Sequence, residues 1–384
     1  MNSKFAADKK KNNLLFVIPS LRRAGAETQA IDLINTVDAE KYNKTVAVLS
    51  SNIDQIDSID QSMAEVIKFA RRFKFDLSII RNLSAFISSR EIDIIHCTLQ
   101  FSLLIAWLAV FFSKKNPKLI VAIHTTLQRN RKDEILDRYL YRYLLARCSK
   151  IIFVCQAQAD YWVRKFPEIS DRAEVVYNGI DVEYFKRGLM TKEAEDLRQR
   201  LMIEPSDCVL ACVAGFRPEK GHRYLLHAFA ELASQCQLIL AGDGEYKKEM
   251  ESLANVLNIS DKVHFIGSVS DIRPVLELAH LSILASTAVE TFSIAMLESM
   301  SMRVPMLATD IGGLKEAISP GKNGELVPIA DQEALTMTLK RMILGTQWLE
   351  RAGISAREVV VERFTIEKMV FDTEHVMAEA LKRV

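Results

Sequence analysis

The chain contains none of the short patterns that would define its class at once. Its longest apolar run, Leu103 to Phe112, has ten residues, whereas a helix needs about 20 to span a bilayer. There is no Gly-Lys-Ser/Thr loop for the phosphates of a nucleoside triphosphate and no Gly-x-Ser-x-Gly elbow for a nucleophilic serine. We therefore expect neither a membrane-spanning segment nor a P-loop or serine-hydrolase site.

Patterns for disulfides and metal ions are missing as well. The six cysteines include no Cys-x-x-Cys pair, and the polar, basic start from Met1 to Asn13 lacks the apolar stretch of a secretory signal. There is also no Asp-x-Asp motif and no cluster of Cys, His or carboxylates at a recognised metal-binding spacing. These absences favour reduced thiols in a cytoplasmic protein, a loose N-terminal tail and no metal site.

What is present is the composition of an ordinary globular protein. A chain of 384 residues, 49% hydrophobic and 26% charged, is too long for one ordinary core, which predicts two domains. The net charge of +1 hides an asymmetry, because residues 1–190 carry 29 Lys/Arg against 21 Asp/Glu and the remainder 21 against 28. The basic first half suits an anionic acceptor or a membrane surface, unless it is scattered surface charge.

Short β-branched runs alternate with helical patterns, which predicts βα units and parallel sheets. The first series of runs is Leu14–Ile18, Thr45–Leu49, Asp93–Cys97, Lys118–Ile123, Lys150–Cys155 and Glu174–Tyr177. The second is Cys208–Ala214, Gln237–Ala241, Lys262–Ile266, Leu281–Ala285, Val304–Ala308 and Gly324–Val327. A turn at Asn178–Asp181 and a charged segment at Lys186–Gln199 separate the two series. Two doubly wound domains follow, with a boundary near residues 184–200.

The loop Gly215–Gly221 follows the first strand of the second series and carries two basic side chains. Arg217 and Lys220 stand three residues apart in it. Such a loop can place two positive charges on a diphosphate that gains charge as it leaves. The alternative is an ordinary solvated basic loop.

Glu290 and Glu298 flank the start of a predicted helix that follows the run Leu281–Ser286. At 1.5 Å rise per residue they lie roughly 12 Å apart along the axis. Glu290 can accept hydrogen bonds from sugar hydroxyls and Glu298 from a ribose diol, while the N–H groups at the helix start meet a diphosphate. The alternatives are a helix-capping acid for Glu290 and a solvated helix-face residue for Glu298.

Two features of the first series also lie at the ends of predicted strands, like the two motifs of the second series. The loop Ser20–Glu27 joins the first strand to a helix predicted at Thr28–Val37, and Gly25 lets its backbone approach a ligand closely. His124 ends the strand Leu119–Ile123, where open α/β sheets place their ligand crevice. A neutral imidazole there can hydrogen-bond a sugar hydroxyl. A tight turn and a histidine bonded to a local backbone group are the alternatives.

Together these motifs resemble the retaining, GT-B-fold glycosyltransferases of family four (glycosyltransferase group 1 type), whose signature is Glu, seven residues, Glu. The resemblance implies an α/β fold of two Rossmann-like doubly wound domains facing a central cleft. It implies an acceptor-binding domain at 1–186, a nucleotide-sugar-binding domain at 187–364 and a helix at 365–384 that returns to the first domain. One departure is Ala24, which stands where the family's Gly-Gly-Ala-Glu pattern has its first glycine.

The resemblance also implies roles for single residues. The expected catalytic residues are His124, Arg217, Lys220 and Glu290. The expected donor-binding residues are Gly25, Arg217, Lys220, Val269, Glu290, Thr291, Phe292, Ser293, Ile294 and Glu298. The expected substrate is a UDP- or GDP-sugar, with no separate cofactor and no metal.

A basic aromatic stretch from Arg129 to Lys150 has seven basic and three acidic side chains interleaved with Tyr139, Tyr141 and Tyr143. Such an amphipathic helix either lies on an anionic membrane or is a domain helix with a solvated basic face. A second patch at 69–75 is interpreted as a core helix, and no fold motif for nucleic-acid binding accompanies either.

The sequence thus predicts a retaining, metal-independent glycosyltransferase that moves a sugar to a hydroxyl of a glycan or lipid-linked acceptor. Cell-envelope polysaccharide or glycolipid synthesis is the expected setting, in the cytoplasm or at the cytoplasmic face of the membrane. The alternatives are a nucleotide-sugar epimerase, a glucan phosphorylase and a non-catalytic binding protein. No nucleic-acid partner is expected.

Overall fold

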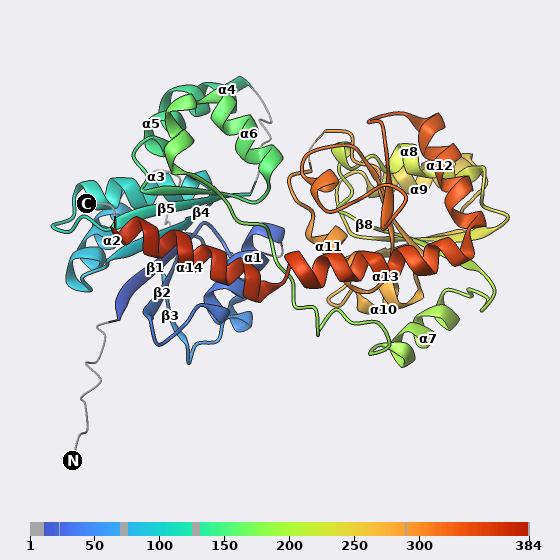
Figure 1. Ribbon diagram of the computed structural model, residues 1–384, viewed down its shortest axis with the longest axis horizontal. Helices are drawn as coiled ribbons and strands as arrows, with labels where there is room; N and C mark the ends of the chain where they lie inside the picture. Colours follow the sequence, from blue (N-terminus) through green and yellow to red (C-terminus); the bar gives the residue numbers. More distant parts are fainter. Residues whose placement is uncertain (1–10, 23, 70–75, 125–130, 289, 383–384) are drawn as a thin grey trace, which may run out of the picture. The chain divides into compact units, whose positions relative to one another are not determined.

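The computed structural model describes residues 11–22, 24–69, 76–124, 131–288 and 290–382. The chain forms two compact units (Figure 1), one made of residues 1–177 and 366–384 and the other of residues 178–365. The predicted patch at 69–75 lies outside the described residues beyond Phe69, as does most of the predicted N-terminal tail. Both units are α/β, as the alternation of strand and helix patterns predicts.

The described residues of the first unit form a seven-stranded parallel sheet in the order β3-β2-β1-β4-β5-β6-β7. Its strands are β1 (Asn12–Ile18), β2 (Tyr42–Val48), β3 (Ala64–Lys68), β4 (Ile94–Thr98), β5 (Lys118–Ile123), β6 (Lys150–Phe153) and β7 (Ala173–Val175). The central strands are buried and rich in Val, Ile and Leu, as expected for a parallel sheet covered on both faces. Only β3, a five-residue edge strand in which Glu65 and Lys68 are exposed, was not predicted.

Helices cover both faces of this sheet. They are α1 (Gly25–Thr36), η1 (Ile56–Ser58), α2 (Ser78–Ser89), α3 (Leu99–Phe111), α4 (Arg131–Leu136), η2 (Asp137–Tyr141), α5 (Arg142–Leu145), α6 (Gln156–Lys165), η3 (Pro167–Arg172) and α14 (Ile366–Lys382). One core cluster packs α2, α3, α5 and α6 on one face, and a second packs α1 and α14 on the other. Figure 1 shows α14, the predicted C-terminal helix, lying along this unit.

The helix predicted across 129–150 is shorter and broken. The described part runs through α4, the π-helical turn η2 and α5, which ends at Leu145. Lys150 is not on a solvated helix face but is the buried first residue of β6, where its ammonium pairs with Glu174 and, at 2.7 Å, with Glu379 of α14. At this end the predicted strand Lys150–Cys155 is confirmed, and the overlapping interpretation of Lys150 as the end of a basic helix is wrong.

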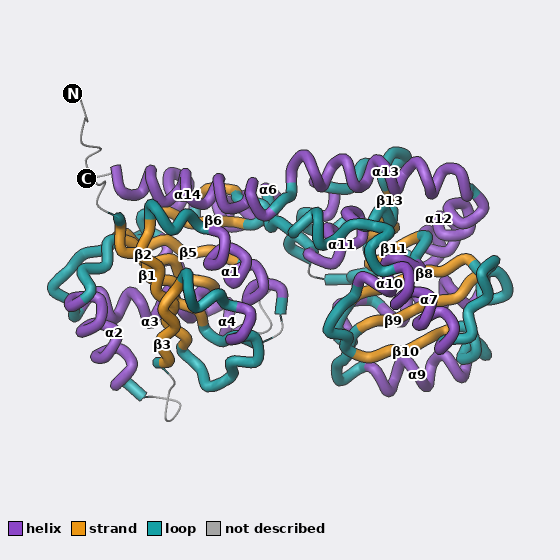
Figure 2. The backbone as a smooth tube through the Cα atoms, turned by 90° about the horizontal axis from the view of Figure 1, so that it is seen from below, coloured by secondary structure: helices purple, strands orange, loops and turns teal. Residues whose placement is uncertain are grey.

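The described residues of the second unit form a six-stranded parallel sheet in the order β10-β9-β8-β11-β12-β13, part of which is visible in Figure 2. Its strands are β8 (Cys208–Val213), β9 (Cys236–Ala241), β10 (Val263–Gly267), β11 (Leu281–Leu284), β12 (Met306–Thr309) and β13 (Gly324–Val327). All six agree with the predicted second series to within two residues at each end. Apolar runs with flanking turns were a sufficient signal here.

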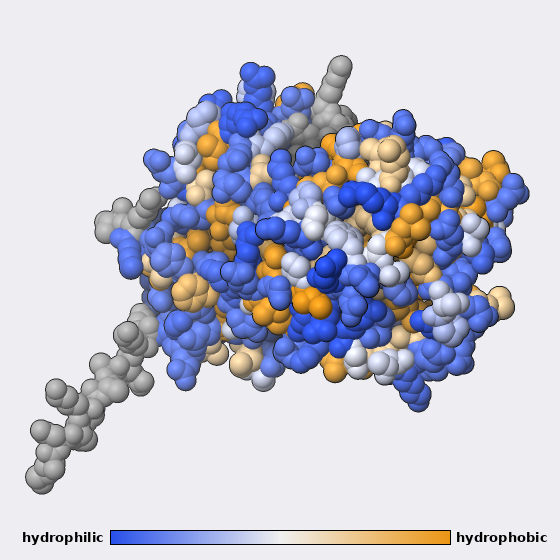
Figure 3. Space-filling view, turned by 45° about the vertical axis from the view of Figure 1, so that its right-hand side comes forward, coloured by the Kyte–Doolittle hydropathy of each residue, from blue (hydrophilic) through white to orange (hydrophobic). Residues whose placement is uncertain are grey.

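Helices again cover both faces of the second sheet. They are α7 (Thr191–Arg200), η4 (Pro218–Lys220), α8 (His222–Ala230), α9 (Lys247–Val256), α10 (Arg273–Leu278), α11 (Ile294–Ser301), η5 (Leu314–Glu316), α12 (Gln332–Leu344) and α13 (Thr346–Arg363). Side chains of α8, α9 and α12 form one core cluster with the sheet, and those of α7 and α10 form another. The face drawn in Figure 3 is mostly hydrophilic, with apolar groups between the polar ones.

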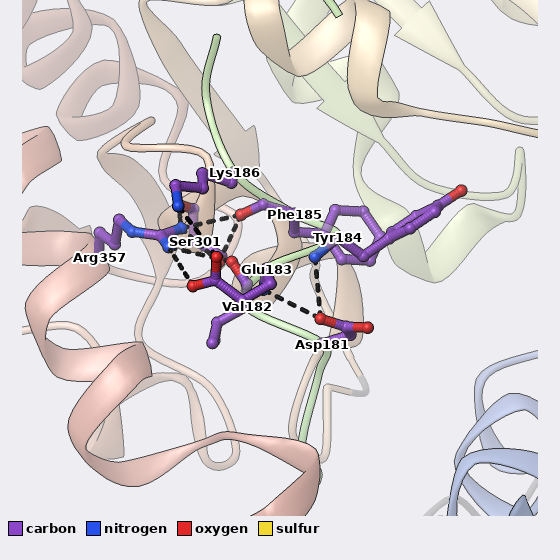
Figure 4. Close-up of polar contacts among 8 residues, drawn as sticks. All are labelled: Asp181, Val182, Glu183, Tyr184, Phe185, Lys186, Ser301 and Arg357. Atoms are coloured by element: carbon purple, nitrogen blue, oxygen red, sulfur yellow. Dashed lines mark hydrogen bonds and ion pairs between the residues drawn. The ribbon is translucent and has the colours of Figure 1, made fainter. Parts of the chain in front are cut away.

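The domain boundary lies at 177/178 rather than at the predicted 186/187, because the segment 178–187 is fastened to the second unit (Figure 4). Arg357 of α13 donates to the carbonyl oxygens of Val182 (3.0 Å), Phe185 (3.0 Å) and Ser301 (2.7 Å). The Ser301 hydroxyl also donates to the Phe185 carbonyl at 2.7 Å. The charge and turn pattern located the linker but could not show which unit holds it.

Candidate functional site

The order of strands in the second sheet indicates where a ligand-binding crevice is expected. The sheet winds one way from β8 through β9 to β10 and the other way from β11 to β13. In open α/β sheets, ligands bind beyond the carboxyl ends of the strands where the winding reverses, here β8 and β11. The loops that follow these two strands are the predicted segments 215–221 and 286–293.

The loop after β8 presents its two basic residues differently. Lys220 turns inward, with 14% of its side chain exposed, and forms an ion pair with Glu290. Arg217 is 47% exposed and pairs with Glu219 at 3.2 Å. Gly221 has a φ of 68°, and a Cβ there would overlap the carbonyl oxygen of Ala285. A glycine is therefore required for the loop to lie against the end of β11.

Glu290 is the centre of the site on the β11 side. Its side chain is 7% exposed, and the same carboxylate oxygen that faces Lys220 accepts a hydrogen bond from the Ser286 hydroxyl at 2.9 Å. A carboxylate this buried is costly unless it is paired and hydrogen-bonded, and these two partners meet that requirement. The structure thus joins the two predicted loops through a single cluster of Lys220, Ser286 and Glu290.

The backbone of the Glu290 loop is fixed from two sides. Gly312, with a φ of 59°, lies so close that a Cβ would overlap the carbonyl oxygen of Glu290. The Gly313 N–H donates to the Thr291 carbonyl at 2.7 Å, and the Asn178 amide donates to the Phe292 carbonyl at 2.9 Å. The loop is therefore held before α11 begins, which suits a site that must present its N–H groups in fixed directions.

Helix α11 begins directly after this loop. Ser293 is its N-cap, and the Ser293 hydroxyl accepts from the Met296 N–H at 3.3 Å. The first N–H groups of a helix have no partner within the helix, so those near Ile294 are donors for an anion at this end. The short α11 thus presents the positive end of its dipole to the same cluster that contains Lys220.

Glu298 lies further along α11, near a second group of side chains. Burial, the charge of Asp271 and that of Glu298 raise the pKa of Tyr184, while Arg273 opposes the shift. The Arg273 guanidinium lies 3.6 Å from the centre of the Tyr184 ring. Glu298 is therefore within electrostatic range of Tyr184, and an aromatic ring with an arginine over it is a suitable surface for a nucleoside.

Val269 lies beyond β10 and is 36% exposed. With Ile266, Asp271 and Pro274 it lines a cavity of about 400 Å³ that α7 bounds on the other side. Asp271 connects this cavity to the Tyr184 group, since it pairs with Arg273 at 2.6 Å. Val269, which is predicted to bind the donor, thus lies beside a cavity that Asp271 connects to Arg273 and Tyr184.

The first unit has its own reversal between β1 and β4. After β1, helix α1 begins at Gly25, three residues earlier than predicted, with Ala24 in extended backbone as its N-cap. Glu27 in the first turn is buried and accepts hydrogen bonds from Ser20 (3.0 Å) and Arg22 (3.2 Å). The small residues form the start of a helix, and Glu27 holds the preceding loop in place.

His124 follows β5 at the same edge of the first sheet, as predicted. Burial lowers the pKa of His124 to about 4. Burial, together with the charge that His124 would carry, likewise lowers the pKa of His96 on β4 to about 4. Both imidazoles are therefore neutral near pH 7, which is the form that can donate through one nitrogen and accept through the other.

The structure brings the predicted residues together in two sets. Residues 217, 220, 269, 290–294 and 298 belong to the second unit, and Gly25 and His124 belong to the first. Sequence reasoning did not assign a role to Ser286 or Tyr184, which the structure places beside the predicted residues. Ser286 ends the run Leu281–Ser286, but only the folded structure shows that its hydroxyl faces the Glu290 carboxylate.

Two doubly wound α/β units in one chain are the architecture of the GT-B glycosyltransferases. Residues 193–359 match the family model of the glycosyl transferases group 1, and residues 23–184 match that of glycosyltransferase family 4. Together the two matches span most of the chain, which belongs to the glycosyltransferases of group 1 and family 4. Among solved structures, Anabaena Alr3699/HepE in complex with UDP-glucose is similar, with a TM-score of 0.85 at 23% identity over 95% of this chain and 99% of that one.

Two curated relatives show the range of reactions among similar chains. The N-acetyl-alpha-D-glucosaminyl L-malate synthase of Bacillus anthracis is 26% identical over 80% of each chain. The N-acetylgalactosamine-N,N'-diacetylbacillosaminyl-diphospho-undecaprenol 4-alpha-N-acetylgalactosaminyltransferase of Campylobacter jejuni is 25% identical over 62% of this chain and 64% of that one. Glycosyl transfer is common to both names, while the acceptors differ.

Proposed function

We propose that the protein is a retaining glycosyltransferase that uses a UDP- or GDP-sugar and needs no metal ion. The observation that carries this proposal is the cluster of Lys220, Ser286 and Glu290 at the N-terminus of α11. It combines a cation and helix N–H groups for a diphosphate with a carboxylate for sugar hydroxyls. The UDP-glucose complex of the similar Anabaena protein supports a nucleotide-sugar donor.

The donor lies along α11 in this proposal. Its sugar is at the Glu290 end, its diphosphate meets Lys220, Arg217 and the helix N–H groups, and its ribose diol meets Glu298. The aromatic ring of Tyr184 and the loop at Val269 accommodate the nucleoside. A diphosphate can compete with Glu290 for the Lys220 ammonium, because phosphate oxygens and carboxylates accept the same charge-assisted hydrogen bonds.

In the reaction, an acceptor hydroxyl attacks the anomeric carbon on the face that the diphosphate leaves. The new bond joins the acceptor oxygen to that carbon, the bond to the diphosphate oxygen breaks, and the acceptor proton passes to the leaving diphosphate. Lys220, Arg217 and the α11 N–H groups stabilise the charge that develops on that oxygen. The first unit, in which neutral His124 follows β5, binds the acceptor in this proposal.

We further propose a glycan or lipid-linked acceptor, in envelope polysaccharide or glycolipid synthesis at the cytoplasmic face of a membrane. The lipid-linked acceptor in the name of the Campylobacter jejuni relative supports this choice. Every helix in the described part of the chain is too short or too polar to cross a membrane. Access to a lipid-linked acceptor then requires an exposed surface that meets the bilayer.

The experiment that tests the proposed reaction has two stages. A thermal-shift panel of UDP-, GDP- and ADP-sugars identifies the donor, because a bound ligand raises the unfolding temperature by mass action. The radiolabelled donor is then incubated with a lipid extract and with soluble glycans, and nuclear magnetic resonance gives the anomeric configuration of the product. An inverted product, or no stabilisation by any donor, would contradict the proposal.

Two alternatives are separated by the same materials. An epimerase changes the donor when it is incubated alone, and a glucan phosphorylase releases a sugar phosphate from glucan and inorganic phosphate. A non-catalytic binding protein is stabilised by the donor but transfers nothing. The paired, buried Glu290 and Lys220 favour a working site over this last alternative.

A further inference from the structure

The first unit exposes an aromatic strip that its own core does not use. Phe111 and Phe112 at the end of α3 are 69% and 67% exposed, and Tyr139 of η2 is 72% exposed. Ile135 and Tyr143 are exposed as well. Single exposed apolar residues are normal on a protein surface, whereas contiguous groups of large ones mark interaction sites.

Ring contacts make these residues contiguous. Phe112 packs edge-on against Phe111 with ring centres 5.1 Å apart, and Phe111 stacks on Trp107 at 5.9 Å. Trp107 in turn meets Tyr143 of α5 at 5.9 Å, which joins the end of α3 to the basic aromatic stretch. We call this set of Trp107, Phe111, Phe112, Tyr139 and Tyr143, with Ile135, the aromatic strip.

Spacing along the chain extends the strip across α4, η2 and α5. Ile135, Tyr139 and Tyr143 recur every four residues through α4, η2 and α5, which places them on one face, and Arg147 follows two residues after the end of α5. The Arg147 guanidinium lies 3.3 Å from the centre of the Tyr143 ring. The strip therefore ends on a cation that can reach beyond the ring plane.

The charge next to the strip is positive. Lys115 pairs with Glu91 at 2.8 Å, Arg142 pairs with Glu168, and the buried Asp137 pairs with Lys165 at 3.2 Å. Lys114, Arg138 and Arg147 add positive charge that no carboxylate among the described residues pairs with, and the acidic residues of α4 are Asp133 and Glu134. Large aromatic side chains beside unpaired cations suit the headgroup region of an anionic bilayer.

We infer that the aromatic strip inserts into the interface of an anionic membrane, with Phe111 and Phe112 as the deepest residues. The charge complementarity selects a lipid surface over an apolar protein groove. The basic stretch alone predicts only electrostatic adsorption, but the rings of α3 add a hydrophobic contact that salt does not screen. This inference concerns lipid binding and stands whether or not the proposed transfer reaction is correct.

The test uses the full-length protein and vesicles of phosphatidylcholine with and without phosphatidylglycerol. The wild type should sediment with the anionic vesicles and leave a residual bound fraction at high salt. Phe111→Ser and Phe112→Ser should each lower the partition coefficient about 10- to 150-fold, because each removes a phenylalanine ring that the membrane would bury. Lys114→Glu with Arg138→Glu should abolish the preference for anionic lipid.

A matched control is Phe371→Ser. Phe371 is 67% exposed, like Phe112, but lies on α14, which packs on the opposite face of the sheet. This variant should bind vesicles as the wild type does. Brominated lipids should quench the fluorescence of Trp107 in a variant whose Trp162 and Trp348 are phenylalanine, which reports insertion directly.

Several outcomes would overturn the inference. Wild-type protein that stays in the supernatant with anionic vesicles excludes a membrane surface. Equal binding by the Phe111, Phe112 and Phe371 variants shows that the strip does not insert. Concentration-dependent self-association that the Phe111 and Phe112 changes abolish, without vesicle binding, assigns the strip to a contact between copies of the chain.

Discussion

The division of roles between Glu290 and Glu298 leads to opposite effects on nucleotide binding. In the structure Glu290 pairs with Lys220, whereas Glu298 lies near Tyr184 further along α11. Removing the Glu290 carboxylate leaves a nearly buried ammonium for a diphosphate to pair with. We therefore expect Glu290→Ala to lower turnover strongly while UDP or GDP binds at least as tightly as to the wild type.

The magnitude for Glu298 follows from the contact proposed for it. A hydrogen bond to a charged group contributes about 1.5–3 kcal/mol, so Glu298→Ala should weaken nucleotide binding about 10- to 150-fold. Glu290→Ala also carries a cost in stability, because removing one partner of a fully buried ion pair costs about 3–5 kcal/mol. The 14% exposure of the Lys220 side chain makes that figure an upper bound.

Calorimetric titration with UDP or GDP, combined with initial rates, measures both effects. Glu290→Gln is the conservative variant, since it keeps an acceptor for Ser286 but removes the charge. Glu358→Ala, at an exposed glutamate on α13, is the control for a neutral helix-surface change. Equal losses of nucleotide affinity in the Glu290 and Glu298 variants, or wild-type turnover in Glu290→Ala, would refute the assignment.

Three further predictions concern metal, the linker and pH. Turnover should persist in excess EDTA, and rescue of an EDTA-inactivated enzyme by Mg²⁺ or Mn²⁺ would contradict the proposed role of Arg217 and Lys220. Arg357→Ala should lower the unfolding free energy by about 2–3 kcal/mol in urea titrations, because three carbonyl oxygens lose a charged donor, while Arg351→Ala on the same helix should change it little. The folded protein holds His96 neutral, with a pKa of about 4, below the unfolded value near 6.5. The unfolded chain thus binds more protons than the folded protein between these two pKa values, so the free energy of unfolding should decrease as the pH is lowered, by about 2 kcal/mol between pH 7 and pH 5 from His96 alone. In urea titrations at several pH values, His96→Leu should make the free energy of unfolding depend less on pH between pH 5 and pH 7.

The sequence was most informative where one physical signal determined the structure. Buried parallel strands must be apolar and β-branched, so all six strands of the second sheet could be located, whereas β3, exposed at an edge, carries Glu65 and Lys68 and gives no such signal. The boundary error has a different cause. The segment 178–187 belongs to the second unit because Arg357, more than 170 residues later in the chain, donates to its carbonyl oxygens.

The candidate site shows the same distinction at the level of single groups. A residue type and its place at a strand end are local properties, so Arg217, Lys220, Glu290 and the start of α11 could be predicted as one anion-binding region. Their pairing could not, because Lys220 reaches Glu290 only when Gly221 lets the loop lie against Ala285, and the αL backbone of Gly221 is a property of the folded chain. The Lys220–Glu290 pair has a consequence for how a donor could bind. If Lys220 binds the diphosphate as proposed, donor binding exchanges one partner of Lys220 for another, because its ammonium is already paired with Glu290. In this proposal Glu290 is free to bind the sugar once the diphosphate pairs with Lys220, which is why loss of Glu290 should affect turnover and nucleotide affinity in different directions.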